Sequence, residues 1–190
     1  MKKHLERSSD HHPFLEGQRI ILRPLSVKDI SSTYHSWLND PEVNRFNSHA
    51  IFPYTKGELL LYVKSVSRDR SKVILAIIDR KTDKHIGNIA LQSIDWVGRS
   101  AELAILIGEK TQWGKGIGVE VGKLIVNYGF NRLGLHRIWC GTSSDNIGMQ
   151  KIAERTGMKR EGVRRDAMFK NGRWVNIIEY GILQSEFEQG

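Results

Sequence analysis

The sequence lacks the residues that define several classes of protein. Cys140 is the single cysteine among 190 residues, which excludes an internal disulfide framework and a cysteine-rich metal site and suits a reducing compartment. The longest buried-looking run, Val73 to Ile78, is far too short to span a bilayer. No apolar stretch follows the charged N-terminus, so we expect no signal peptide, no membrane association and a cytoplasmic protein.

The basic residues are also not concentrated in any one segment. The formal net charge of +8 favours anionic ligands, such as a phosphorylated cofactor or a nucleotide-linked substrate. Because there is no Lys/Arg block, a solvated basic surface is the plainer interpretation, and no nucleic-acid binding is expected. Adjacent His11 and His12 without a further ligand are more typical of a surface, so no metal site is expected.

The hydrophobic pattern predicts one α/β domain. Hydrophobic residues make up 39% and charged residues 26%, close to the average of globular proteins. Residues 1–16 are polar and are expected to form a flexible arm, whereas 17–190 contain no repeat or linker and are expected to form a single domain. Strands are expected at 19–23, 73–79, 85–94, 100–107, 136–142, 163–169 and 174–183.

Two capping patterns predict the first helices. Ser26 and Asp29 have the spacing of a capping box and predict a helix that runs through Trp37. Thr55 and Glu58 repeat the pattern and predict a helix to about residue 68.

The second half of the chain predicts two more helices and a hairpin. Apolar residues at helical spacing predict a helix over 117–131. Asn146 can cap a short helix that stops at Gly157. Asn171 and Gly172 predict the tight turn of a final hairpin.

A glycine-rich turn, WGKGIG at 113–118, separates a predicted strand from an amphipathic helix. Glycine permits positive φ and exposes successive N–H groups, which together with the helix dipole form a pyrophosphate site. Lys115 adds positive charge. A plain tight turn is the alternative interpretation of these glycines.

Other phosphate-binding motifs do not fit this turn. The Gly-x-x-x-x-Gly-Lys-Ser/Thr pattern of nucleoside-triphosphate binding is absent. A dinucleotide fold places its glycines after the first strand of a βαβ unit, whereas here they follow what looks like a three-strand antiparallel meander. A nicotinamide cofactor is therefore not expected.

Short segments in a characteristic order also run along the chain. They are ILRP at 21–24, WLNDPEV at 37–43, HIGN at 85–88, AEL at 101–103, WGKG at 113–116, Asn146, EGVR at 161–164 and FKNG at 169–172. Together they resemble the GNAT acetyltransferase superfamily, and within it the branch of ribosomal-protein N-terminal acetyltransferases. The resemblance extends over about residues 17–183.

This resemblance implies a fold and a cofactor. The fold would be a mixed, mostly antiparallel sheet flanked by helices, whose central parallel strands, 100–107 and 136–142, splay apart to receive acetyl-CoA. Main-chain groups of Ile105, Leu106 and Ile107 would pair with its pantetheine arm.

The resemblance also implies which residues bind the rest of acetyl-CoA. Main-chain N–H groups would hold its pyrophosphate, and Asn146 would contact the pantetheine side. The residues that would supply these N–H groups are Trp113, Gly114, Lys115, Gly116, Ile117 and Gly118.

The sequence departs from the family at two positions. Trp113 stands where many members have Arg or Gln, although Trp is frequent in this branch. Many members have a Tyr that protonates the leaving thiolate four residues before the glycine that ends the short helix, and here that residue is Ala153. A water molecule, Ser143, Ser144 or Tyr180 remains as an alternative proton donor.

An amine must lose a proton before it attacks a thioester, and a positioned base accelerates such reactions by about 10²–10⁴-fold. Glu102, beside the expected thioester, is the candidate catalytic residue. The alternative is a surface carboxylate paired with Arg99 or Lys84. Asp95 and His49 are weaker candidates for the base.

Cys140 stands in a strand that is expected to be buried. A small apolar packing role is therefore favoured over a covalent acetyl-cysteine route.

The acceptor should contact the variable segments 44–54, 95–99 and 168–174. Phe46, Trp96 and Trp174 are the candidate substrate-binding residues, as walls of an acceptor pocket. The basic charge balance argues against a polyamine and fits a nucleotide-linked amino sugar.

The predicted function is therefore an acetyl-CoA-dependent N-acetyltransferase that acts on a small primary amine such as an amino sugar. A protein N-terminal acetyltransferase is the alternative. The missing Tyr suggests a third possibility from another class, a non-catalytic CoA-binding domain. Dimers are common among similar proteins, so a homodimer is a candidate assembly.

Overall fold

The computed structural model describes residues 12–47 and 51–187. Eight strands form one mixed sheet in the order β1-β2-β3-β4-β5-β6-β8-β7. The strands are β1 (Leu15–Glu16), β2 (Ile20–Pro24), β3 (Val73–Asp79), β4 (His85–Asp95), β5 (Ser100–Ile107), β6 (Arg137–Ser143), β7 (Lys159–Lys170) and β8 (Arg173–Leu183). Among the described strands only β5 and β6 pair in parallel. The predicted fold class, a mostly antiparallel sheet around one parallel pair, is confirmed.

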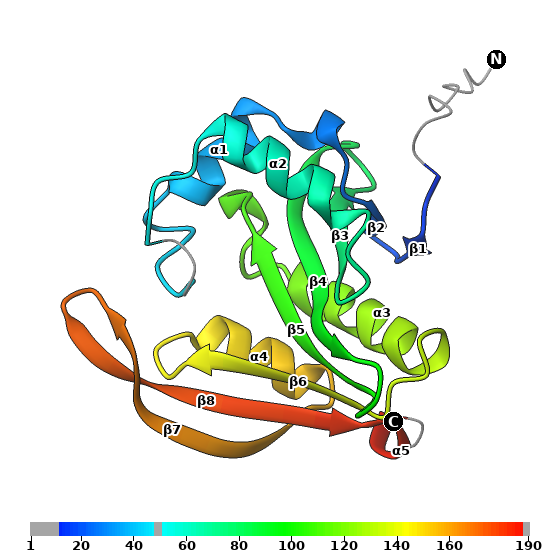
Figure 1. The fold of residues 1–190 in the computed structure, drawn as a ribbon, viewed down its shortest axis with the longest axis vertical. Coiled ribbons are helices and arrows are strands. Elements are labelled where there is room, and N and C mark those ends of the chain that lie inside the picture. The colour runs from blue at the N-terminus through cyan, green and yellow to red at the C-terminus, as the bar shows by residue number, and fades with distance from the viewer. Residues whose placement is uncertain (1–11, 48–50, 188–190) are drawn as a thin grey trace.

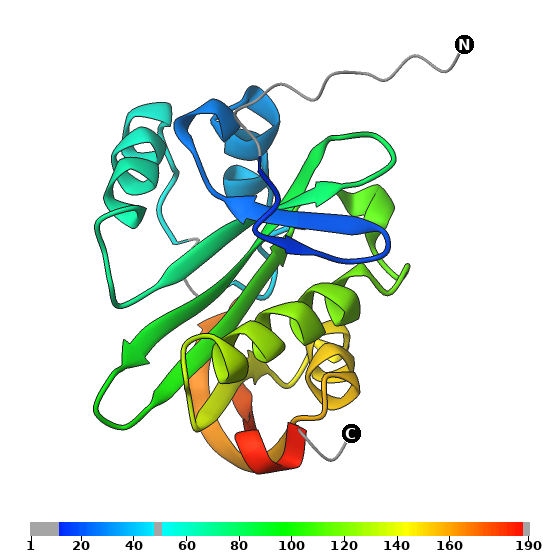
Figure 2. The same cartoon turned by 90° about the vertical axis from the view of Figure 1, so that its right-hand side faces the viewer.

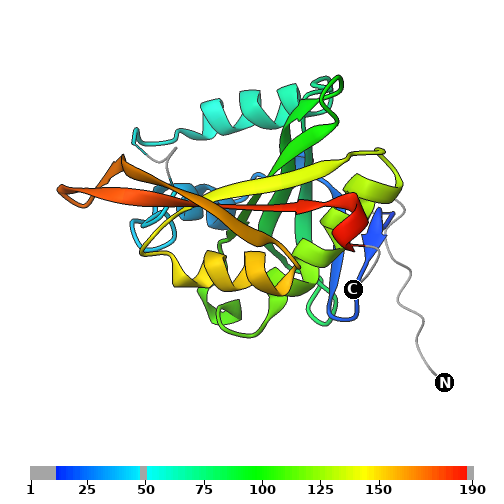
Figure 3. The ribbon, with the colours of Figure 1, turned by 90° about the horizontal axis from the view of Figure 1, so that it is seen from below.

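Helices cover both faces of the sheet. On one face lie α3 (Ile117–Asn131) and α4 (Ile147–Arg155), and on the other α1 (Ser32–Asn39) and α2 (Lys56–Val66) (Figures 1 and 2). A single turn of helix, α5 (Gln184–Phe187), follows β8. Figure 3 shows α2 and α4 on opposite sides of the strands.

Strand β3 shows why the sequence is so apolar at the centre of the sheet. Leu75 and Ile77 pack with the α3 and α4 side of the core, whereas Ile74 and Ala76 pack with the α1 and α2 side. Because both faces are buried, polar and apolar residues do not alternate along this strand.

The start of the first helix differs from the prediction. The capping box forms, since Asp29 accepts hydrogen bonds from the Ser26 main-chain N–H and hydroxyl, but it begins only a 3₁₀ turn, Val27–Asp29. The chain leaves helical geometry at Ile30 with ψ of 81°. Helix α1 then starts at Ser32 with Ser31 as its N-cap. The helix predicted by Thr55 and Glu58 does form, as α2.

The predicted boundary of the flexible arm, at Glu16, is wrong. Leu15 and Glu16 pair with β2, and the Phe14 ring packs edge-to-face on Tyr128 with centroids 5.1 Å apart. The apolar side chains of Phe14 and Leu15 hold this segment to the domain. The polar residues around them in the sequence led to the prediction of a flexible arm. Residues 1–11, which include His11, lie outside the described residues.

The central parallel strands part early, as predicted. They pair only as Ser100–Arg137, Ala101–Ile138 and Glu102–Trp139. Beyond Glu102, β5 continues against β4 alone, while β6 continues against β8 as far as Ser143 (Figure 1). A wedge therefore opens between β5 and β6 just after Glu102.

The β7–β8 hairpin projects beyond the rest of the sheet (Figure 3). Asn171 and Gly172 have φ of 51° and 78°, as the predicted tight hairpin turn requires. Near this turn, Lys170 Nζ donates a 2.8 Å hydrogen bond to the carbonyl oxygen of Asn47 in the segment after α1. The two segments that flank the open end of the wedge are thereby joined.

Across the described residues, none of the helices combines the length and apolar character needed to cross a membrane.

Candidate acyl-donor and amine site

The glycine-rich turn presents main-chain N–H groups where α3 begins. Gly114 and Gly116 have φ of +74° and +78°, which glycine adopts without strain. The Glu120 N–H bonds the Gly116 carbonyl at 3.2 Å, so the N–H groups of residues 117–119 precede the first hydrogen bond of the helix. Successive amides and the positive end of a helix dipole fit a pyrophosphate.

Side-chain contacts fix the segment just before this turn. The Trp113 indole Nε1 donates a 2.8 Å hydrogen bond to the Ile107 carbonyl, at the end of β5. Lys110 Nζ lies 2.8 Å from Asp40 and 2.5 Å from Glu42, on the turn that follows α1. The turn is thus tied both to β5 and to the α1 side of the sheet.

The main chain of β5 presents alternate residues to the wedge. The Arg99 carbonyl accepts hydrogen bonds from the His136 and Arg137 N–H groups at the start of β6, whereas the Gly108 N–H donates to the Ile86 carbonyl in β4. These hydrogen-bonding directions alternate along a strand. The main-chain N–H and C=O groups of Ile105 and Ile107 therefore point toward the wedge, and those of Leu106 point toward β4. The main-chain groups of Ile105 and the N–H of Ile107 are therefore placed to pair with an extended ligand, whereas the Ile107 carbonyl already accepts from the Trp113 indole. The N–H and C=O groups of Leu106 are directed away from the wedge.

Asn146 is the N-cap of α4. Its Oδ1 accepts a 3.1 Å hydrogen bond from the Met149 N–H, so this oxygen holds the helix start. The half-buried side chain retains its Nδ2 as the group with which it could contact a ligand. The sequence placed this residue correctly at the start of the helix.

Glu102 lies at the point where the wedge opens. Ala104 packs with the α1 and α2 side of the core, so Glu102, two residues earlier on the same strand, faces that side. Its Oε2 accepts a 3.0 Å hydrogen bond from Gln92 Nε2. In the described part of the chain no cationic side chain is within ion-pair distance of it, so the alternative role, a surface carboxylate paired with Arg99 or Lys84, is not seen.

Arg45 joins two residues that the sequence assigned to different ligands. Its guanidinium lies 4.7 Å from the Phe46 ring centroid and 5.7 Å from that of Trp113. A candidate acceptor-binding residue and a candidate cofactor-binding residue thus meet at one exposed cation. Sequence reasoning missed Arg45, because nothing local distinguishes it from other surface arginines.

The three candidate acceptor-binding aromatics are not brought together. Trp174 packs edge-to-face with Phe169 at 5.3 Å near the hairpin turn, which Lys170 joins to the segment that carries Phe46. Trp96 lies in the turn that precedes β5, and its Nε1 donates to the Arg70 carbonyl. Phe46 and Trp174 therefore flank the open end of the wedge, and Trp96 lies at the other end of β5.

The structure also locates the candidate proton donors. Ala153 is buried in the core between α4 and the sheet. The Tyr180 hydroxyl is 3.3 Å from Glu154 and 3.5 Å from Gln150, both on α4. Ser143 is buried and its Oγ accepts from the Asp145 N–H. None of these contacts places a donor beside the thioester position.

Cys140 faces the core and not the wedge. Its Sγ lies 3.7 Å from the Met158 sulfur. Burial, and to a lesser degree the charge of Glu102, raise the pKa of the thiol to about 12. The thiolate needed for covalent catalysis is therefore not populated at neutral pH.

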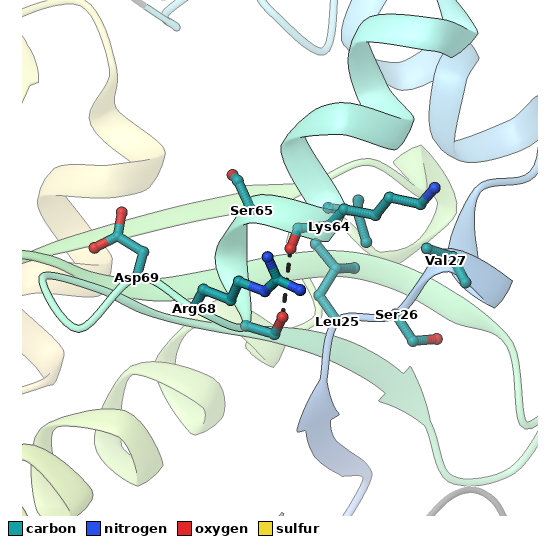
Figure 4. Close-up of a pocket in the computed structure, with 9 residues that line it drawn as sticks. Leu25, Ser26, Val27, Lys64, Ser65, Arg68 and Asp69 are labelled. Carbon is teal, nitrogen blue, oxygen red and sulfur yellow. Dashed lines mark hydrogen bonds between the residues drawn. The ribbon is translucent and has the colours of Figure 1, made fainter.

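Other features of the surface lie outside this arrangement. A groove between the 3₁₀ turn at Val27–Asp29 and α2 contains none of the candidate site residues (Figure 4). Its lining consists of Leu25, Ser26, Val27, Val63, Lys64, Ser65, Ser67, Arg68 and Asp69. Residues 12–47 and 51–187 contain no group of three His, Cys, Asp or Glu side chains that could hold a metal ion. His49 falls outside the described residues.

Taken together, a splayed parallel strand pair, a glycine-rich turn at a helix N-terminus and an unneutralised carboxylate define a site for transfer of an acyl group from a phosphorylated thioester. Comparison with known proteins agrees. Residues 19–159 match the acetyltransferase (GNAT) domain family, and the chain belongs to this family.

Several relatives cover most of the chain. A protein named uncharacterized N-acetyltransferase p20, of Bacillus licheniformis, is 27% identical over 177 residues, which are 91% of this chain and 97% of the relative. The spermidine N(1)-acetyltransferase of Escherichia coli (strain K12) is 29% identical over 168 residues, 87% of each protein. The spermidine N-acetyltransferase of Vibrio cholerae, solved with CoA and spermine, has a TM-score of 0.82 at 25% identity and covers 90% of this chain and 99% of that one.

These findings make the protein an N-acetyltransferase that uses acetyl-CoA. The ribosomal-protein branch has weaker support than the resemblance implied. The putative ribosomal N-acetyltransferase YdaF of Bacillus subtilis (strain 168) is 31% identical over 102 residues, 54% of this chain, whereas the match to the Escherichia coli spermidine enzyme covers 87% of it.

Proposed function

We propose that this enzyme acetylates a small molecule with a single primary amine and a neutral or anionic remainder, such as a nucleotide-linked amino sugar. The observation that carries the proposal is Glu102. It is half-buried where the strands part and has no cationic partner among the described residues. An isolated carboxylate there attracts one ammonium group.

Several other carboxylates near the wedge are engaged by basic side chains. They form ion pairs with lysine and arginine side chains, which leaves few sites for a second or third ammonium group. The pairs are Asp40 and Glu42 with Lys110, Asp145 with Arg173, and Glu179 with Arg164. A spermidine molecule, which carries several positive charges, would place one ammonium group at Glu102, and its other ammonium groups would lie near these ion-paired carboxylates.

Basic residues flank the open end of the wedge. Arg45 lies over Phe46 and Trp113, and Lys170 reaches Asn47 from the hairpin. A phosphate or carboxylate on the acceptor would be attracted to these cations while its amine lies at Glu102.

Different residues of the chain would bind the cofactor, orient it and accept the proton of the amine. Acetyl-CoA supplies an acetyl group on a thioester. Ile105 and Ile107 would orient its pantetheine arm, and the N–H groups of residues 113–118 would hold its pyrophosphate. Glu102 would bind the ammonium form of the acceptor and take a proton from it, directly or through a water molecule.

Polyamine acetylation is the second candidate. It is favoured by the names of two relatives, the spermidine acetyltransferases of Escherichia coli and Vibrio cholerae. The ion pairs described above argue against it. A protein N-terminus is the remaining acceptor class, supported by the shorter match to the putative ribosomal enzyme.

An acceptor panel separates these candidates. Purified enzyme with acetyl-CoA is offered a nucleotide-linked amino sugar, a free amino sugar, spermidine, spermine and a short peptide with a free α-amine, and thiol release is measured. We expect release with the nucleotide-linked amino sugar. Release with polyamines alone, or with the peptide alone, would replace the proposed acceptor class and leave the acetyltransferase assignment intact.

A further inference from the structure

Arg19, just before β2, contacts the glycine-rich turn with its side chain. Its Nη1 donates a 2.6 Å hydrogen bond to the Lys115 carbonyl oxygen, although the two residues are 96 positions apart. Its Nε donates to Glu120 Oε2 at 2.8 Å, and its main-chain N–H donates to Glu120 Oε1 at 2.8 Å. One side chain therefore links the turn to the first turns of α3.

The bond to Lys115 fixes the direction of a peptide plane. In a trans peptide the carbonyl oxygen of one residue and the N–H of the next point in opposite directions. Because the Lys115 oxygen points toward Arg19, the Gly116 N–H points away from it. Gly116 also holds a φ of +78°, and an added Cβ there would lie 3.6 Å from Arg19 Nη2.

The hydrogen bonds that Arg19 donates to Glu120 affect the charge next to the glycine-rich turn. Glu120 lies in the first part of α3 with its side chain largely buried. Burial alone would raise its pKa, but hydrogen bonds from the Arg19 main chain and side chain hold the pKa of this carboxyl below its usual range. An ionised carboxylate close to a diphosphate repels it unless a cation offsets the charge.

We propose that Arg19 is a positioning residue for the acetyl-CoA diphosphate, which orients the Gly116 N–H toward the ligand and offsets the charge of Glu120. The proposal rests on the proposed placement of the diphosphate at residues 113–118. Arg19 touches no reacting atom. Its effect is expected on ligands that carry the diphosphate and not on shorter ones.

The test compares ligands with and without that group. Calorimetry gives the affinity of the wild type and of Arg19→Ala for CoA, and steady-state rates give kcat/KM for acetyl-CoA and for S-acetylpantetheine. We expect Arg19→Ala to weaken CoA binding and lower kcat/KM for acetyl-CoA by about tenfold or more, as for loss of a charged hydrogen bond. The rate with S-acetylpantetheine should remain near that of the wild type.

Three further variants complete the design. Arg19→Lys keeps the charge but not the fork that spans two acceptors, so its CoA affinity should be intermediate. Arg19→Ala combined with Glu120→Gln removes the repelling carboxylate and should recover part of the affinity. Arg80→Ala breaks a nearby ion pair, with Glu16, that does not reach the turn, and it should leave CoA affinity unchanged.

Two outcomes would overturn the proposal. One is unchanged CoA affinity in Arg19→Ala, and the other is an equal loss of rate with both acyl donors, which would mean general damage to the fold. If the wild type itself did not prefer CoA to pantetheine, the placement of the diphosphate would fail, which is a different result from failure of the role of Arg19.

Discussion

The side-chain amide of Gln92 donates a 3.0 Å hydrogen bond to the carboxylate of Glu102, its direct neighbour across the β4–β5 pair. Gln92 is uncharged, so it orients Glu102 without neutralising it. The carboxylate stays available for an ammonium group at the point where β5 and β6 separate. A cationic side chain in the place of Gln92 would have neutralised Glu102 and removed its attraction for an ammonium group.

Glu102→Gln should abolish most turnover while CoA binding is retained. The amide cannot accept the proton of the amine, and we expect kcat to fall by about 10²–10⁴-fold. Thiol release measures turnover, and calorimetry measures CoA affinity. Glu16→Gln, on the edge strand β1 and four strands away from β5, is the matched control and should leave both unchanged. Near-normal turnover in Glu102→Gln would remove its assigned role.

Gly114→Ala should weaken CoA binding. Gly114 has φ of +74° and no atom within 4 Å of an added Cβ, so the methyl group costs about 1–2 kcal/mol of backbone strain and disturbs the turn. Gly134→Ala is the control, because Gly134 has φ of +64° and equal space but lies beyond the end of α3. Both variants should lose similar stability, and only Gly114→Ala should lose CoA affinity. Equal CoA affinity in the two variants would contradict the assigned diphosphate site.

Cys140→Ala should keep normal turnover. The thiol is buried and its pKa is raised to about 12, so it takes no covalent part in acetyl transfer. Thiol-alkylating reagents should also fail to inactivate the folded enzyme. A variant that bound CoA but had lost all turnover would restore the acetyl-cysteine route.

Arg23→Met should destabilise the protein strongly. Arg23 and Asp29 form a buried two-point ion pair with distances of 2.6 and 2.8 Å. Removal of one partner leaves a buried charge, and we expect a loss of about 3–5 kcal/mol in the free energy of unfolding, measured with urea. Adding Asp29→Asn to Arg23→Met should recover much of this loss, whereas Arg80→Met, at an exposed pair, should cost no more than about 1 kcal/mol. A loss as small as that of Arg80→Met would mean that the pair is not buried in solution.

His85 should make stability depend on pH in the acid range. Burial lowers the pKa of this histidine, although a hydrogen bond with Asn88 partly opposes the effect. The folded-state pKa lies below the unfolded value near 6.5, so the stabilisation is present above pH 6.5 and is lost as the pH falls below it. The slope should not exceed about 1.4 kcal/mol per pH unit for one proton.

Urea unfolding at several pH values tests this expectation. His85→Gln should flatten the dependence below pH 6.5, whereas replacement of the exposed His136 by Gln should leave it unchanged. An identical slope in wild type and His85→Gln would assign the effect to another group.

Patterns within a few residues predicted most of the elements. The Thr55 and Glu58 capping box, the Asn146 cap and the Asn171–Gly172 turn all formed where expected, because each depends on contacts between near neighbours. The same local logic failed at Ser26, where Asp29 caps a 3₁₀ turn but its carboxylate is also held by Arg23. The apolar pair at residues 14 and 15 was likewise underestimated within a polar arm.

The sequence by itself determined the order of the main strands and helices, the glycine-rich turn before α3 and the carboxylate in β5. The tertiary structure decided which of these meet. Arg19 and Glu120 are 101 positions apart, Gln92 reaches Glu102 only through strand register, and Arg45 joins Phe46 to Trp113 only after α1 has packed on the sheet. Such contacts leave no local pattern, because their energy comes from surfaces that only the folded chain brings together.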